Sequence, residues 1–289
     1  MRVALMVEGQ EGVTWEQWLA LARAAEDASL DGLFRSDHYR SIGRGDPAGS
    51  LDAWATLAGL AAVTTKLRLG TMVSPVTFRR VSVLAKLVTT ADHISNGRVE
   101  LGIGAGWFES EHTAYGFKFG TTKERLDELD RQLEELTRQW TDAPDIWPKP
   151  VQQPHPPIIV GGTAKPRTVR AAVQWADEYN TVFATVDEAR ERKRVLDDAA
   201  REAGRDPLRF SLMTGCVVAR DEEELAERLN QFRSISSQEA PPISGTVDQV
   251  VAQLRAYEEV GVERVMLQHL FHEDVEMVSL LGEVAARLG

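Results

Sequence analysis

An acidic residue and a histidine stand side by side where an apolar run ends. The stretch "GLFRSDHYRS" covers residues 32–41 and contains Asp37 and His38. A histidine with an ordinary pKa of about 6.5 can exchange a proton at neutral pH, and a neighbouring carboxylate can orient its ring. The pair alone is a short motif, because Asp37 could also pair with Arg35 or Arg40 and leave His38 on the surface.

Two glycine-containing stretches could bring the backbone close to a ligand. "LGIGAGW" carries Gly102, Gly104 and Gly106, but this spacing is not the dinucleotide fingerprint GxGxxG, and no helix is expected directly after it. We therefore reject a dinucleotide site. These glycines are expected to let a planar ring lie against the backbone or to serve packing inside a barrel.

The second stretch, "IIVGGTAKPRTV", is better placed for a phosphate. Gly161 and Gly162 end an apolar run, Thr163 could cap the following helix, and Pro166 suits its first turn. The free N–H groups of such a helix start attract anions. A plain turn with a good cap explains the same residues equally well.

Composition excludes several functional classes. The chain has 289 residues, with 44 acidic against 33 basic residues, and its net charge of -11 argues against nucleic acid as a partner. The only cysteine, Cys216, cannot form an internal disulfide and is expected to be a buried apolar residue. We see neither a signal peptide nor an apolar run of about 20 residues, and we expect a soluble, cytoplasmic protein without membrane contact. No metal site is predicted.

Short apolar runs alternate with longer amphipathic ones along the whole chain. Strands are expected at 3–7, 32–36, 67–73, 98–104, 156–162, 178–183, 209–218 and 263–270. Helices are expected at 14–30 with Thr14 as cap, 51–65, 79–95, 121–140, 165–176 and 187–203, and after the last two strands. Eight strand–helix units predict an α/β fold, a single (β/α)₈ barrel domain over 1–289, and a doubly wound open sheet is the alternative.

In such a barrel, functional residues follow the carboxyl ends of the strands. Asp37 and His38 satisfy this rule. Glu8 and Glu109 are further acids expected at the same mouth, and His269 stands at the end of the last strand.

Taken together, these stretches resemble the luciferase-like monooxygenase family, and more narrowly its branch that uses the deazaflavin coenzyme F420. "SDHY" is similar to the Ser-Asp-His of that branch, where flavin-using members more often show Glu-His-His. The blocks "RLGTMVSPVTFRRVSVLAKLVTTADHISNGRVELGIGAGW" and "PHPPIIVGGTAKPRTVRAAVQWADEYN" resemble the family's most specific segments. The resemblance covers nearly the whole chain.

The resemblance implies a bacterial luciferase-like TIM barrel that holds the deazaflavin at its mouth, and we expect a homodimer. Asp37 and His38 would face the ring and a small-molecule substrate, with His38 as proton carrier. The implied cofactor-binding residues are Asp37, Met72, Val73, Gly106, Trp107, Gly161, Gly162 and Thr163. A non-prolyl cis peptide is implied between Met72 and Val73.

Two departures from the family pattern bear on activity. Trp107 stands where the sugar-phosphate dehydrogenases of this branch carry a catalytic glutamate, so that activity is not expected. The segment from Trp140 to Pro154 is shorter than in typical relatives, which predicts a more open mouth or a cover supplied by a partner.

Three functional hypotheses follow. The first is an F420-dependent oxidoreductase that transfers a hydride between the deazaflavin and a small organic substrate. The second is an FMN-dependent monooxygenase that receives reduced flavin from a separate reductase. The third is a cofactor-binding barrel without catalysis, or a barrel that works on some other phosphorylated ligand. "SDH" favours the first. A basic set near the mouth is expected to hold the anionic tail of F420: Arg40, Arg44, Arg79, Arg80, Lys165 and Arg167.

Overall fold

The computed structural model describes residues 1–43 and 49–289, in which strands and helices alternate along the chain. The strands are β1 (Arg2–Val7), β2 (Gly32–Arg35), β3 (Arg68–Thr71), β4 (Ser74–Pro75), β5 (Val99–Gly104), β6 (Ile158–Gly162), β7 (Glu178–Val182), β8 (Arg209–Ala219), β9 (Ile243–Thr246) and β10 (Arg264–His269). The α-helices are α1 (Trp15–Asp27), α2 (Ala53–Val63), α3 (Val81–Ser95), α4 (Glu109–Tyr115), α5 (Thr122–Trp140), α6 (Pro166–Trp175), α7 (Val186–Glu202), α8 (Glu222–Ile235), α9 (Val247–Glu259) and α10 (Val275–Leu288). A single 3₁₀ turn, η1 (Gly9–Glu11), follows β1.

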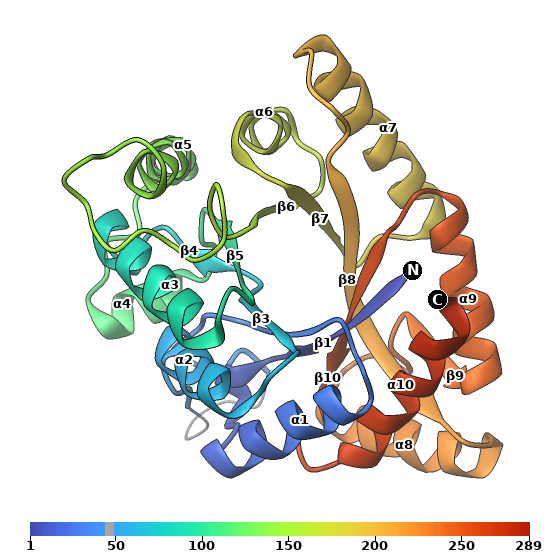
Figure 1. Cartoon of the computed structure of the whole chain (residues 1–289). Helices are drawn as coiled ribbons and strands as arrows, with labels where there is room; N and C mark the ends of the chain where they lie inside the picture. Colours follow the sequence, from blue (N-terminus) through green and yellow to red (C-terminus); the bar gives the residue numbers. More distant parts are fainter. Residues whose placement is uncertain (44–48) are drawn as a thin grey trace.

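The strands close into a parallel barrel. Their order is β10–β1–β2–β3–β5–β6–β7–β8, and β8 also pairs with β10, which completes the ring. The two-residue β4 follows β3 and pairs with β5, whereas β9 pairs only with the second half of β8. Figure 1 shows the helices arranged around these strands. The predicted (β/α)₈ barrel is confirmed, and the closed ring excludes the open sheet.

Local signals set where the helices begin. Thr14 caps α1 as predicted: its hydroxyl accepts from the Gln17 N–H at 3.3 Å, and the Gln17 side chain accepts from the Thr14 N–H at 2.9 Å. The prediction that Thr163 caps α6 is wrong. That helix begins at Pro166 with Lys165 as its N-cap, because the fixed φ of proline suits the first helical position.

The floor of the barrel, at the amino ends of the strands, is ionic. Arg264 on β10 donates to Glu100 on β5 at 2.6 Å and to Glu178 on β7 at 2.7 Å, and all three side chains are buried. Burial alone would raise the pKa of Glu100, but Arg264 and Arg68 lower it to about 2. Burial raises the pKa of Glu178, so the pair of Arg264 with Glu100 is the part of the floor that stays charged over the ordinary pH range.

An apolar plug lies directly above this floor and fills the middle of the barrel. It consists of Ala4, Met6, Phe34, Met72, Ile159, Met213 and Met266. A larger apolar core separates the outer side of the strands from the helices. Cys216 belongs to that outer core, as expected for a buried apolar residue, and burial raises the pKa of its thiol to about 12.

The segment after α5 packs at the floor end of the barrel, so its length does not affect how open the mouth is. The Gln152 side chain donates to the Val99 carbonyl at the start of β5 at 2.8 Å, and its backbone N–H donates to Asp92 at 3.0 Å. The prediction that a short segment between Trp140 and Pro154 opens the mouth is therefore wrong, because this segment lies at the opposite end of the barrel.

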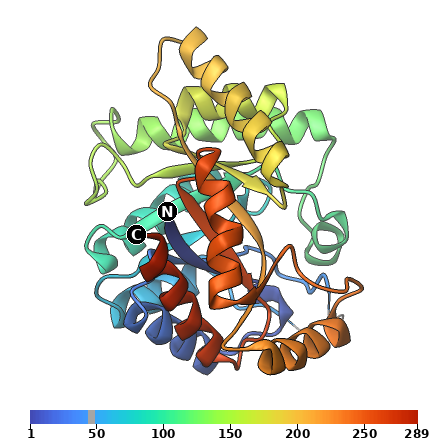
Figure 2. The same ribbon diagram turned by 90° about the vertical axis from the view of Figure 1, so that its right-hand side faces the viewer.

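The first and last residues of the chain lie side by side, as both Figure 1 and Figure 2 show. The amino group of Met1 donates to the Leu288 carbonyl at 3.2 Å and forms an ion pair with Glu258 at 2.6 Å. Within the described ranges, no helix combines the length and apolar character that crossing a membrane requires.

Candidate active site

A cavity of about 620 Å³ opens at the carboxyl ends of the strands. Each of the eight barrel strands contributes residues to the wall of the cavity, either from the strand itself or from the chain that follows it. Its volume lies in the usual range of small-molecule and cofactor sites, roughly 300–1,000 Å³. In this fold the carboxyl ends of the strands are also where active sites form.

His38 is part of the cavity wall. Its ring Nδ1 lies 2.7 Å from Oε1 of Glu111, which stands on α4. Its Nε2 makes no hydrogen bond with the described residues, and the rings of Trp107 and Phe108 meet the imidazole edge-on at 5.8 and 6.0 Å. His38 therefore has one nitrogen fixed by a carboxylate and one free for a ligand.

The surroundings of His38 favour its charged form. Burial by itself lowers the pKa of the imidazole, but the hydrogen bond and charge of Glu111, with smaller contributions from Glu8 and Asp37, raise it above the usual value of 6.5. The imidazole is thus a candidate proton donor at neutral pH.

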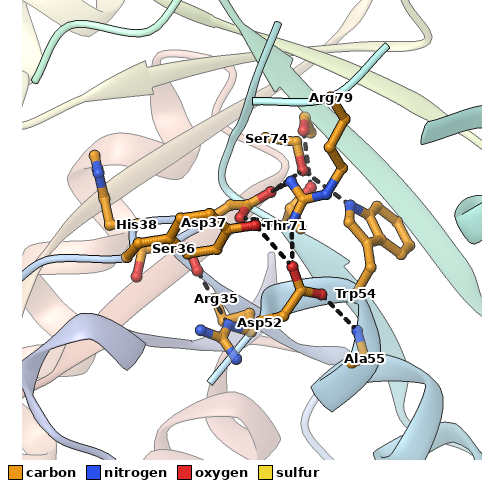
Figure 3. A network of polar contacts seen from close by, with 12 residues as sticks. Arg35, Ser36, Asp37, His38, Asp52, Trp54, Ala55, Thr71, Ser74 and Arg79 are labelled. Carbon is orange, nitrogen blue, oxygen red and sulfur yellow. Dashed lines mark hydrogen bonds and ion pairs between the residues drawn. The ribbon is translucent and has the colours of Figure 1, made fainter. Parts of the chain in front are cut away.

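Asp37 lies in a different environment from its neighbour. Its carboxylate accepts from Arg79 at 2.6 and 3.2 Å and from the Ser74 hydroxyl at 2.7 Å, and its side chain is fully buried. Figure 3 shows Asp37 within this network, whereas the His38 ring points away from it. The expectation that Asp37 faces the cavity is wrong, because its side chain is directed into the wall and is not among the lining residues.

Another part of the cavity wall contains three glycines and the residues that follow β3. Gly106, Gly161 and Gly162 line it, together with Met72 and Val73. The peptide bond between Met72 and Val73 is cis, as predicted. Gly162 has a φ of 152°, which side chains rarely adopt, so this strand end requires glycine.

The remaining predicted cofactor residues lie toward the rim. Trp107 lines the cavity and is 61% exposed, so its indole could cover a bound ligand. Thr163 is exposed and does not line the cavity, although it directly follows the lining glycines.

A carboxylate held by two amides forms the polar part of the wall. Glu8 accepts from the side chains of Gln268 at 2.6 Å and Gln10 at 2.8 Å. All three residues line the cavity, so the expectation that Glu8 lies at the mouth is confirmed.

The other two reserve residues lie elsewhere. Glu109 is the exposed first residue of α4 and does not line the cavity. His269 is completely buried, and burial lowers its pKa to about 4, so it is a neutral core histidine and no part of the mouth.

Two members of the expected basic set are committed to ion pairs with acidic side chains. Arg79 is paired with Asp37 and Asp52, the latter in a 2.5 Å contact. Arg167 is paired with Asp127 at 2.7 Å and with Asp130 at 2.9 Å. Arg80 and Lys165 are exposed, Arg40 is partly buried, and Arg44 lies outside the described residues.

Glu111 is the residue that sequence reasoning missed. It is separated from His38 by 73 positions, and only the arrangement of α4 over the end of β2 brings the two together. A signal was present in "FESEHTAY", where an acid and the buried His112 stand together on a short helix, but such a pair is common on helix surfaces.

Comparison with known protein sequences finds relatives along most of the chain. A family model described as luciferase-like monooxygenase matches residues 2–241. An uncharacterized protein of Mycobacterium tuberculosis is 30% identical over 251 residues, which cover 82% of this chain and 81% of that protein.

Solved structures with the same fold include users of both cofactors. An F420-dependent secondary alcohol dehydrogenase, in complex with an F420–acetone adduct, superposes with a TM-score of 0.80 at 18% identity, covering 100% of this chain and 99% of that one. The oxygenating constituent of a type II Baeyer–Villiger monooxygenase from Pseudomonas putida, in complex with FMN, superposes with a TM-score of 0.79 at 18% identity, covering 99% and 98%. At this identity the likeness establishes the fold alone.

Proposed function

The chain belongs to the luciferase-like monooxygenase family, and from this premise we propose that it is a coenzyme F420-dependent oxidoreductase. It transfers a hydride between the deazaflavin and a small organic substrate. The alternative is an FMN-dependent monooxygenase supplied with reduced flavin by a separate reductase, since relatives of both kinds share the fold.

The cavity suits a cofactor with a flat ring and a phosphate. A side chain at Gly161 would meet Asn180 only at ordinary contact distance, so this lining position leaves open space for a ligand, whereas side chains at Gly106 and Gly162 would press on Pro75 and Tyr179. Met72 and Val73 would support the ring from the barrel side, and Trp107 would cover it from the rim. The backbone around Gly162 and Thr163, just before α6, would meet the phosphate, although Thr163 does not cap that helix.

When bound, a deazaflavin supplies the hydride chemistry, so the protein has to orient the reactants and handle one proton. His38 is the group on this wall that can do so. Its Nε2 is free and its Nδ1 is held, which fixes the ring while leaving one nitrogen for the substrate. The single observation that carries the proposal is this histidine on the wall of a cofactor-sized cavity. The Ser36–Asp37–His38 sequence favours F420 over FMN.

A binding titration tests the choice of cofactor. We expect F420 to quench the fluorescence of the cavity tryptophan Trp107 at a lower concentration than FMN in the same buffer. Tighter binding of FMN would favour the monooxygenase. Gly161→Val places a larger side chain in the cavity, and it should weaken binding of the true cofactor by about tenfold or more, a loss of about 1.4 kcal/mol.

A further inference from the structure

Glu111 commits both oxygens of its carboxylate to the segment that carries His38. Oε1 lies 2.7 Å from Nδ1 of His38, and Oε2 accepts from the backbone N–H of Tyr39 at 3.1 Å. The side chain is 1% exposed, so neither contact is shared with bulk water. The bidentate geometry fixes the position of the imidazole relative to the backbone of its own loop.

The helix that carries Glu111 is itself held in place. His112, the next residue, lies with Nε2 2.6 Å from the Thr77 hydroxyl and with Nδ1 2.7 Å from the Phe108 carbonyl. Tyr115, at the end of α4, donates to the Tyr39 carbonyl at 3.1 Å. The helix is thus bound to the chain after β4 and to the chain after β2, and Glu111 projects from a fixed support.

We infer that Glu111 is a positioning residue that fixes the His38 ring with Nδ1 toward α4 and Nε2 toward the cavity, and that holds the proton on Nδ1. This inference rests on the proposed function, because it gives His38 its role in proton transfer. Glu111 is one of the residues that line the cavity, but both of its carboxylate oxygens are already bonded, one to His38 and one to the Tyr39 N–H. Its effect on a substrate therefore passes through the histidine.

The arrangement has a consequence for the direction of the reaction. With Nδ1–H bound to Glu111, a charged His38 carries a second proton on Nε2, which faces the cavity. A bound deazaflavin would supply the hydride for reduction of a carbonyl or an activated C=C bond, and the substrate would then need one proton. Nε2 of charged His38 would donate that proton, and neutral His38 would regain one from water. Oxidation of the substrate requires neutral His38 as proton acceptor, so the pH optimum of the oxidation should be more alkaline than that of the reduction.

The test uses the cofactor-free chain, so that it does not depend on whether F420 is the right cofactor. The His38 ring signals are followed by NMR as a function of pH in the unmodified chain and in Glu111→Gln. The amide keeps the size of the side chain and removes its charge, so the titration of His38 should move to lower pH. In the same variant, diethyl pyrocarbonate, which attacks neutral imidazole, should modify His38 several-fold faster near pH 6.5, as located by mass spectrometry.

Glu109→Gln is the matched control. It removes the same charge from the same helix two residues away, at an exposed position that does not line the cavity. It should leave both measurements unchanged. Glu111→Asp keeps the charge, so the pH at which His38 titrates should lie closer to that of the unmodified chain than to that of Glu111→Gln.

An unchanged titration of His38 in a folded Glu111→Gln variant would overturn the inference, and so would an equal shift in the Glu109→Gln control. If the amide variant does not fold, Glu111→Ala is measured against the same control, and an unchanged titration of His38 in that variant would overturn the inference. Failure of F420 to bind would refute the proposed function and leave these two readouts standing.

Discussion

Asp37 and His38 are adjacent in the chain, yet their side chains pair with residues of different elements. Arg79, just before α3, holds Asp37 through two hydrogen bonds of 2.6 and 3.2 Å. Glu111 on α4 holds His38 at 2.7 Å. We therefore expect the two side chains to have separable roles: Asp37 would anchor the wall, and His38, which lines the cavity, would face a ligand.

Replacing the histidine tests its role as proton carrier. With a confirmed substrate, His38→Ala should lower kcat by about 10²–10⁴-fold, because the general acid is lost. Cofactor affinity should stay close to that of the unmodified chain. His93→Ala, at an exposed position on α3, is the control and should retain full turnover. Full turnover by the His38 variant would place the proton donor elsewhere on the cavity wall, with Glu8 the next residue to test.

Replacing the aspartate should affect stability more than binding. Asp37→Asn removes the buried charge that Arg79 and Ser74 bond, so the free energy of unfolding should fall by about 1.5–3 kcal/mol. Asp52→Asn is the matched control, because asparagine still caps α2 and only the half-exposed partner of Arg79 is lost. Its effect should be smaller in urea unfolding. Unaltered stability with lost cofactor binding would instead place Asp37 against the ligand.

The ionic floor makes a strong prediction about stability. Arg264→Met leaves the buried Glu100 and Glu178 facing each other, and breaking such a network costs about 3–5 kcal/mol. Arg2 lies opposite Arg264 in the strand register, but its side chain is 38% exposed and its ion pair with Asp31 is long at 3.5 Å. Arg2→Met should therefore cost at most about 1 kcal/mol. Equal losses in urea unfolding would show that the floor network is no more important than a surface pair.

His269 predicts a pH dependence of stability. In the unfolded chain its pKa is about 6.5, whereas burial lowers it to about 4 in the fold. As the pH falls below about 6.5, His269 binds a proton in the unfolded state but not in the folded state. The free energy of unfolding therefore decreases until the pH reaches the pKa of His269 in the folded state. The contribution of this group should fall by about 2 kcal/mol between about pH 7 and about pH 5.

His269→Leu should lose this part of the pH dependence. The comparison is the difference in unfolding free energy between the two pH values, measured for the variant and for the unmodified chain. The same difference in both would mean that His269 is protonated inside the fold or is not the group that titrates.

The barrel was predictable because its signals are local. Alternating apolar runs and helix caps such as Thr14 depend on residues a few positions apart. The strand β9 was missed, because its four residues include a single apolar side chain, that of Ile243, and pair only with the outer half of β8. The segment from Trp140 to Pro154 joins a helix to the next strand, so the predicted barrel already places it at the amino ends of the strands, and the expectation that it opens the mouth overlooked this.

The site was predictable only in part, for a related reason. The position of His38, Gly161 and Gly162 follows from the rule that parallel strands end at one edge. Which carboxylate pairs with which cation does not follow from the rule. Asp37 had Arg35 and Arg40 as neighbours in sequence, yet Arg79, 42 positions away, is its partner. Such pairings are decided by packing across the barrel.

The apolar plug limits how protons can travel in this protein. Its members, which include Met6 and Met266, carry no exchangeable side-chain proton. The buried amide of Asn180 beside Met266 is bonded to Ser211, and through it to Glu178 of the floor, but this chain of hydrogen bonds does not reach His38. A proton that leaves His38 therefore has no relay through the barrel axis among the described residues. It must be replaced through the mouth, on the side where substrate enters. Anything that closes the mouth over a bound ligand would thus also isolate the histidine from its proton supply, and each cycle would begin with whatever proton the ring held at closure.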